Sequence, residues 1–120
     1  MMDPKVMALE LAKALDSKKG QNIQALKTGD LTTLADYFVI CTATSNTQVK
    51  ALSDYCEKEL KEQGEAPHHT EGHRGGTWVL MDYSSVVAHI FLEETRDFYD
   101  LERLWKDATS IDLTEILKPE

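Results

Sequence analysis

The chain has 120 residues, of which 42% are hydrophobic and 28% charged, a balance typical of a globular protein and wrong for a disordered one. Its length suits a single domain spanning residues 1–120, and no apolar run approaches the roughly 20 residues that a membrane-spanning helix needs. The net charge of -8 argues against nucleic acid as the primary partner, because phosphate binding needs a basic surface, and it suits a basic protein partner.

The N-terminal segment predicts a helix and then a strand. Asp3 can cap a helix in which Pro4 occupies the first position, where its missing N–H costs nothing. The pattern ends near Gly20, and residues 22–27 form a modest strand candidate. The segment has neither the basic cap nor the uninterrupted apolar stretch of a signal peptide, so we expect a cytoplasmic protein.

A strand and a second helix are expected next. Residues 36–43, DYFVICTA, are almost continuously apolar and rich in β-forming side chains, which favours a strand buried on both faces. Ser45 and Gln48 have the spacing of a capping box, and the helix that they open should end at Gly64.

The second half begins with a turn-rich segment that contains at most a short strand over residues 68–71. Two apolar runs, residues 77–82 and 86–92, are separated by a polar turn and predict a hairpin. Residues 96–108 have the apolar spacing of a last helix, and the tail that follows has the character of a frayed final turn.

Helices and strands in this order alternate only in part. We therefore predict an α/β protein of the α+β kind, with a mixed β-sheet and helices mainly on one face. In so short a chain the other face of the sheet is expected to stay open.

The predicted hairpin has one face that suits an interaction surface. Trp78, Leu80 and Asp82 alternate onto this face because side chains in a strand point to opposite sides in turn. A large aromatic side chain on an uncovered sheet face is typical of a partner site, although tryptophan is as often a core residue. The pattern alone leaves both interpretations open.

Two groups of residues could carry chemistry. On an extended chain His69, Glu71 and His73 would point the same way and could hold zinc in an open site, but the adjoining glycines favour a solvated turn. His89 could act as a general base, although a strand histidine with a hydrogen-bonded ring is the commoner case. We predict no catalytic residue, no metal ligand and no cofactor.

Carboxylates gather where the last helix should begin. The group consists of Glu93, Glu94, Asp97, Asp100 and Glu102. Acidic side chains near a helix N-terminus interact favourably with the helix dipole, which explains part of the cluster. A solvated helix face and an acidic patch for a basic partner remain the two interpretations.

Taken together, four segments resemble the bacterial ribosomal silencing factors, also called the Iojap family. They are DYFVI before the capped QVKAL helix, EG before WVLMDY, VVAHIF, and ETRDFYDLERLW, all in the right order over residues 31–108. The resemblance implies a nucleotidyltransferase-like fold and, in many members, a homodimer. It implies a cytoplasmic protein that binds the large ribosomal subunit through ribosomal protein L-fourteen, blocks joining of the small subunit and lowers translation when nutrients are short.

The family's partner surface includes the WVL strand, so Trp78 and Leu80 are the expected apolar anchors, with Asp82 beside them. By charge complementarity we add Glu94, Asp97, Asp100 and Glu102 as contacts to a basic ribosomal protein. The chain departs from the family pattern at Ala43, Thr44 and Ser84, where we expect Ser84 to fit a turn without positive φ.

The competing hypothesis is an enzyme, either nucleotidyltransferase-like or metal-dependent. Fold analogy alone is a weak argument for catalysis. Nucleotidyl transfer needs clustered carboxylates that hold Mg²⁺ beside a glycine-serine turn, and no such turn precedes Asp82.

Overall fold

The computed structural model describes residues 2–31, 33, 35–99, 106–114, 116 and 117. The elements are α1 (Pro4–Ser17), β1 (Gln21–Lys27), β2 (Tyr37–Ala43), α2 (Asn46–Glu62), β3 (His69–Glu71), β4 (Trp78–Asp82), β5 (Val86–Leu92), α3 (Glu93–Tyr99) and β6 (Thr109–Ser110). Up to the end of β5 they agree with the predicted order. Within these residues we find no helix long and apolar enough to cross a membrane.

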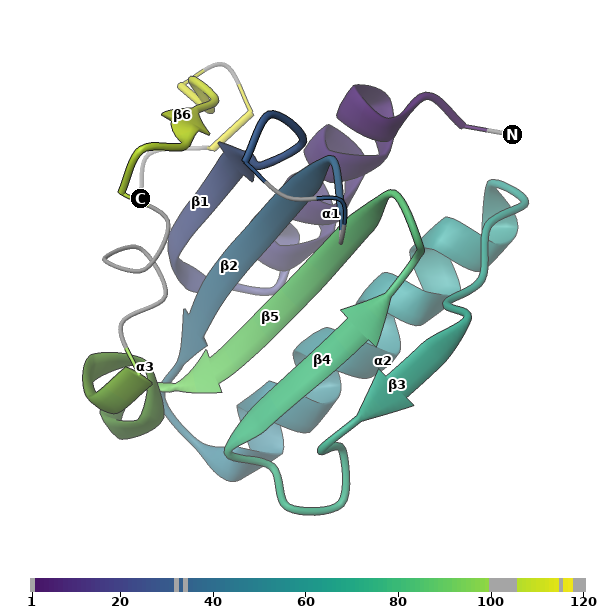
Figure 1. The fold of residues 1–120 in the computed structure, drawn as a ribbon. Helices are drawn as coiled ribbons and strands as arrows, with labels where there is room; N and C mark the ends of the chain where they lie inside the picture. The colour runs from purple at the N-terminus through teal and green to yellow at the C-terminus, as the bar shows by residue number, and fades with distance from the viewer. Residues whose placement is uncertain (1, 32, 34, 100–105, 115, 118–120) are drawn as a thin grey trace.

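The strands form one mixed sheet in the order β3-β4-β5-β2-β1-β6. The central pair, β2 and β5, is parallel, and every other neighbouring pair is antiparallel. Helices α1 and α2 lie together behind the sheet in Figure 1, and α3 lies beyond the end of β5. The predicted α+β fold with a mixed sheet is therefore confirmed, while its nucleotidyltransferase-like character stays a prediction.

Local signals in the sequence explain where both long helices begin. The Asp3 carboxylate accepts hydrogen bonds from the backbone N–H groups of Lys5 and Val6, at 3.1 and 3.4 Å. The Ser45 hydroxyl accepts one from the N–H of Gln48 at 3.1 Å, as the capping box predicted. Each cap satisfies N–H groups that have no partner inside the helix.

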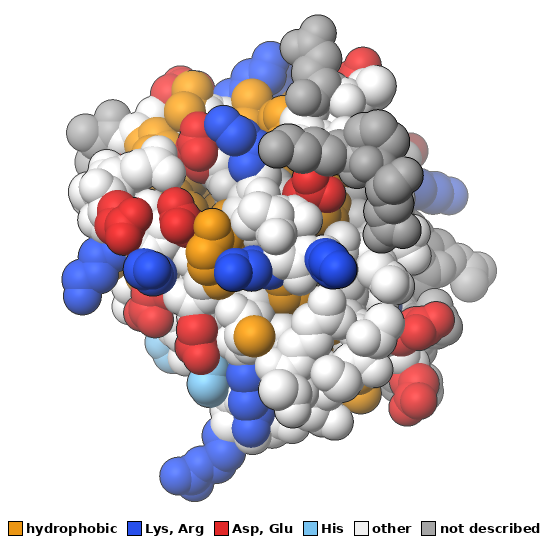
Figure 2. All heavy atoms as spheres, turned by 180° about the vertical axis from the view of Figure 1, so that it is seen from behind, with side chains coloured by type: hydrophobic (Ala, Val, Ile, Leu, Met, Phe, Trp, Pro, Cys, Tyr) orange, Lys and Arg blue, Asp and Glu red, His pale blue; other side chains and the backbone are white. Residues whose placement is uncertain are grey.

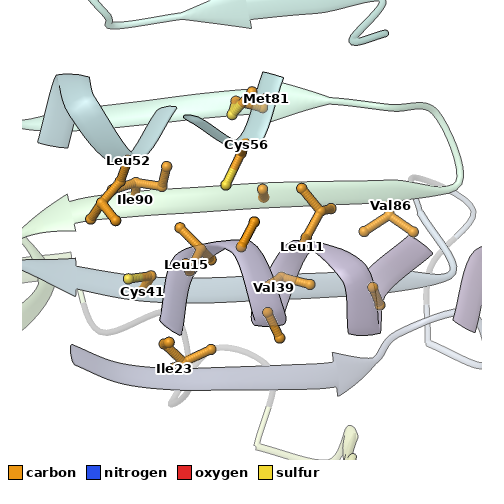
Figure 3. Packing of buried hydrophobic residues seen from close by; sticks show 14 of the residues in the cluster. Leu11, Leu15, Ile23, Val39, Cys41, Leu52, Cys56, Met81, Val86 and Ile90 are labelled. Carbon is orange, nitrogen blue, oxygen red and sulfur yellow. The ribbon is translucent and has the colours of Figure 1, made fainter. Parts of the chain in front are cut away.

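The main core lies between these two helices and the sheet. Figure 3 shows side chains from α1 and α2 meeting the strands, among them Leu15 and Leu52. Cys41 and Cys56 belong to this cluster as free thiols, and burial raises the pKa of Cys41 to about 12 and also raises that of Cys56. Neither cysteine therefore supplies a reactive thiolate at neutral pH.

The C-terminal part differs from the sequence prediction. Helix α3 begins at Glu93, directly after β5, rather than at residue 96. Residues 106 and 107 form a turn, so the predicted helix does not reach residue 108. The tail, expected as a frayed helical turn, instead places Thr109–Ser110 as β6 against β1, where it satisfies backbone groups at the outer side of that strand.

The β4–β5 turn also corrects an expectation. Ser84 has a φ of 76°, although we expected this residue to avoid positive φ. Its backbone N–H donates to the Asp82 carboxylate at 2.7 Å, which is the hydrogen bond of an Asx turn. That local bond helps to hold Ser84 in a conformation that L-residues other than Asn and Asp rarely adopt.

Candidate interaction surface

Strand β4 divides its side chains between the two faces of the sheet, as predicted. Val79 and Met81 are fully buried in the main core beneath the helices. Trp78, Leu80 and Asp82 lie on the opposite face and are partly exposed. The hairpin thus directs its tryptophan away from the helices.

This second face is not bare, which corrects the expectation of an open surface. Six buried residues form a second apolar cluster on it: Leu26, Ala35, Phe38, Ile40, Val87 and Phe91. Ala35 comes from the β1–β2 connection, and Ala108, close to β6, packs against the same cluster. The partly exposed part of the cluster is therefore concentrated on β4, at Trp78 and Leu80.

The indole of Trp78 has a defined environment. Its ring stacks on Phe91, the residue opposite it on β5, with centroids 4.8 Å apart. Its Nε1–H donates to Nδ1 of His89 at 3.1 Å. Burial lowers the pKa of His89 to about 4, so its ring is neutral near pH 7 and can accept this hydrogen bond. The strand histidine with a hydrogen-bonded ring, one of the two interpretations from sequence, is the one observed.

Polar and acidic groups lie beside the partly exposed apolar side chains on the side of β3. The register sets Glu71 of β3 opposite Leu80 and His69 opposite Asp82, and His69 Nε2 lies 3.1 Å from Glu71 Oε1. We define the docking face as Trp78 and Leu80 together with the carboxylates of Glu71 and Asp82. An apolar centre with a polar rim is the usual anatomy of a protein interface.

Helix α3 adds carboxylates beyond the end of β5. Glu94 is exposed in its first turn. The helix is tied to the sheet by Arg96, a buried side chain whose Nη1 donates to the Asn22 carbonyl at 2.6 Å and to the Thr42 hydroxyl at 2.7 Å. This anchor was not predicted from the sequence.

The remaining predicted acidic contacts are located only in part. Asp97 belongs to α3, but its side chain lies outside what the structure describes, and Asp100 and Glu102 fall outside the described residues altogether. Of the predicted site residues, the structure therefore brings Trp78, Leu80 and Asp82 together on one strand.

The candidate zinc ligands do not converge. Gly72 has a φ of 83°, and the turn that it makes sends His73 to α2, where Nε2 lies 2.9 Å from the Asp54 carboxylate. His69 and Glu71 remain on β3. Among the residues described, no three His, Cys, Asp or Glu side chains are placed to hold a metal ion.

The helical side of the molecule has a different character. Figure 2 shows lysine and arginine side chains interspersed with aspartate and glutamate over this face. On α2, for example, Lys58 and Lys61 are exposed close to Glu57 and Glu62, which are also exposed. A surface of mixed charge offers less to a basic partner than the docking face does.

Comparison with known proteins identifies the family. The family model "Ribosomal silencing factor during starvation" matches residues 2–120. A ribosomal silencing factor of Halalkalibacterium halodurans is 37% identical over 91% of this chain and 94% of its own length. The chloroplastic Iojap protein of Zea mays is 36% identical over 88% of this chain and 46% of its own length. A crystal structure from Chromobacterium violaceum superposes with a TM-score of 0.85 at 40% identity, covering 88% of each chain. The chain belongs to the ribosomal silencing factor family.

Proposed function

We propose that the chain is a translational repressor that binds the large ribosomal subunit through ribosomal protein L-fourteen and sterically blocks joining of the small subunit. The observation that carries the proposal is the docking face, where Trp78 and Leu80 stay partly exposed on the sheet face away from α1 and α2. Family membership supports the ribosome as the partner. The setting is the cytoplasm under nutrient limitation, and the whole chain acts as one domain.

Steric repression requires only a stable interface with the large subunit. Specific complexes bury about 800 Å² on each partner, which is roughly a tenth of the 7125 Å² surface of this chain. Trp78 is suited to dominate such an interface, because tryptophans in partly desolvated settings are frequent hot spots. No catalytic group or cofactor takes part, and a homodimer stays a prediction that the proposal does not require.

Charge supports a protein contact in preference to ribosomal RNA. The net charge of -8 repels phosphate and attracts basic ribosomal proteins. Among the carboxylates predicted as contacts from the sequence, the structure describes Glu94, exposed on α3, and Asp82, on β4; Glu71 joins them as part of the docking face. We also propose Asp97, Asp100 and Glu102 as acidic contacts, on the basis of the sequence alone.

A subunit-joining assay tests the proposal. Purified protein, added to separated bacterial large and small subunits, should lower the yield of joined ribosomes in proportion to its occupancy of the large subunit. Undiminished joining at saturating protein would refute steric repression.

A matched pair of charge reversals tests the electrostatic part. Glu94 and Glu62 are both exposed helix residues, but Glu62 lies on α2, on the helical side. Glu94→Lys should weaken large-subunit binding and reduce its dependence on salt, while Glu62→Lys should change neither. Equal effects of the two reversals would show that net charge alone, and not the proposed contact, drives association.

A further inference from the structure

The contact between Trp78 and His89 fixes the protonation state of the histidine. Trp78 donates to Nδ1 at 3.1 Å, so Nδ1 must be the unprotonated nitrogen of the neutral ring, and the proton must sit on Nε2. An indole N–H is a donor only, so the reverse arrangement is excluded. The geometry therefore selects one tautomer of His89.

That tautomer carries a cost. His89 is only 5% exposed, and its Nε2 is buried without a hydrogen-bond partner among the described residues. Its ring is packed by aromatic neighbours, with Phe38 edge-on at 5.0 Å and Phe91 stacked at 6.0 Å. A buried N–H without an acceptor destabilises the folded state, and a phenylalanine would fill a site of this kind without that cost.

We propose that His89 is a positioning residue that holds the Trp78 indole in the orientation in which it docks, an inference that rests on the proposed function of the docking face. Trp78 is partly exposed, so water could satisfy its N–H in other side-chain orientations. The bond to His89 and the stacking on Phe91 together select one orientation before the partner arrives. A preorganised anchor loses less side-chain freedom on binding, which raises affinity.

A positioning role predicts different effects of replacing His89 on large-subunit binding and on the stability of the fold. If His89 served only the fold, replacing it would lower stability and binding together. A positioning role predicts opposite directions for His89→Phe: the urea midpoint stays or rises, because the unsatisfied N–H is gone, while binding to the large subunit weakens. The expected loss of affinity is about fivefold to tenfold, the usual worth of one hydrogen bond.

Nitrogen NMR on the free protein gives the direct test. The chain has two tryptophans, and the Trp78→Phe variant identifies the indole signal of Trp78. In the wild type, His89 should be protonated at Nε2, and a through-hydrogen-bond coupling should connect Trp78 Nε1 to His89 Nδ1. A ring protonated at Nδ1 would overturn the proposal without any reference to the ribosome.

Binding to isolated large subunits completes the test with two histidine variants. His89→Phe should abolish the coupling and weaken binding, and His89→Asn, whose carbonyl oxygen can replace Nδ1 as acceptor, should recover part of the affinity. If Trp78→Ala weakens binding while His89→Phe binds like the wild type, the positioning role is wrong and the docking face stands. If Trp78→Ala also binds normally, the docking face and this inference both fall.

Discussion

Adjacent residues on β4 should separate folding from binding. Leu80 faces the docking face and is partly exposed, whereas Met81 faces the helices and is fully buried. We therefore compare Leu80→Ala with Met81→Ala. The two substitutions alter neighbouring positions of one strand, so they share its local backbone environment.

The structure sets the expected magnitudes. Met81→Ala leaves a cavity in the main core and should lower the free energy of unfolding by roughly 2–5 kcal/mol, a large part of the 5–15 kcal/mol typical of a domain. Leu80→Ala removes three carbons worth about 0.8 kcal/mol each when fully buried. Because Leu80 is partly exposed, we expect a loss of about 1–2 kcal/mol in the free protein.

Binding should follow the opposite order. The part of Leu80 that is exposed in the free chain becomes buried only when a partner covers it, so Leu80→Ala should weaken large-subunit binding by roughly threefold to fivefold. Met81→Ala, measured where it is still folded, should bind like the wild type. Urea unfolding and quantitative co-sedimentation supply the two numbers. If Leu80→Ala is as destabilising as Met81→Ala and still binds normally, Leu80 belongs to the core and the assignment of faces is wrong.

Three further predictions concern the fold itself. Ser84 has a φ of 76°, so Ser84→Gly should raise the free energy of unfolding by about 0.5–1 kcal/mol, whereas Gly64, at φ 90° with open space around it, should give a loss of about 1 kcal/mol as Gly64→Ala. In urea unfolding, a less stable Ser84→Gly would contradict the first prediction, and a Gly64→Ala as stable as the wild type would contradict the second. Folding lowers the pKa of His89 from 6.5 to about 4, so the unfolded chain takes up this proton at a higher pH than the folded protein does. The free energy of unfolding should therefore fall by up to roughly 3 kcal/mol as the pH drops from 6.5 to 4. An identical pH profile for His89→Phe would refute this. Burial raises the thiol pKa of both Cys41 and Cys56, so neither thiol should react with a thiol reagent at pH 8 until urea unfolds the chain. Rapid labelling of the native protein would contradict the burial of these thiols.

Much of the fold could be predicted because its signals are local. The caps at Asp3 and Ser45 act within three residues, and the alternation in β4 needs only the period of a strand. The mixed sheet followed from the order of the elements. The pattern TWVLMD also showed that β4 divides its side chains between two faces, although it left open whether the face of Trp78 belongs to the core.

The features that escaped prediction depend on contacts between distant parts of the chain. Strand β6 forms because it pairs with the edge of β1, more than eighty residues earlier in the chain. A strand of two residues is too short to show a sequence pattern of its own. Arg96 reaches Thr42, 54 residues away, and the bond between Trp78 and His89 depends on strand register. The positive φ of Ser84 is an exception, because the Asp82 carboxylate that supports the turn lies only two residues away. An aspartate two residues before the turn position is a local signal of an Asx turn, and it was not used in the prediction from sequence. The partial cover of the second face, which includes Ala35, could not be read from strand alternation.

The most direct test of the central claim is co-sedimentation of the wild type and Trp78→Ala with separated large and small ribosomal subunits. Circular dichroism should first show that the variant is folded. The account predicts that the wild type sediments with large subunits and not with small ones, and that Trp78→Ala loses most of this binding. Equal retention of the folded variant on large subunits, or binding of the wild type to neither subunit, would contradict it.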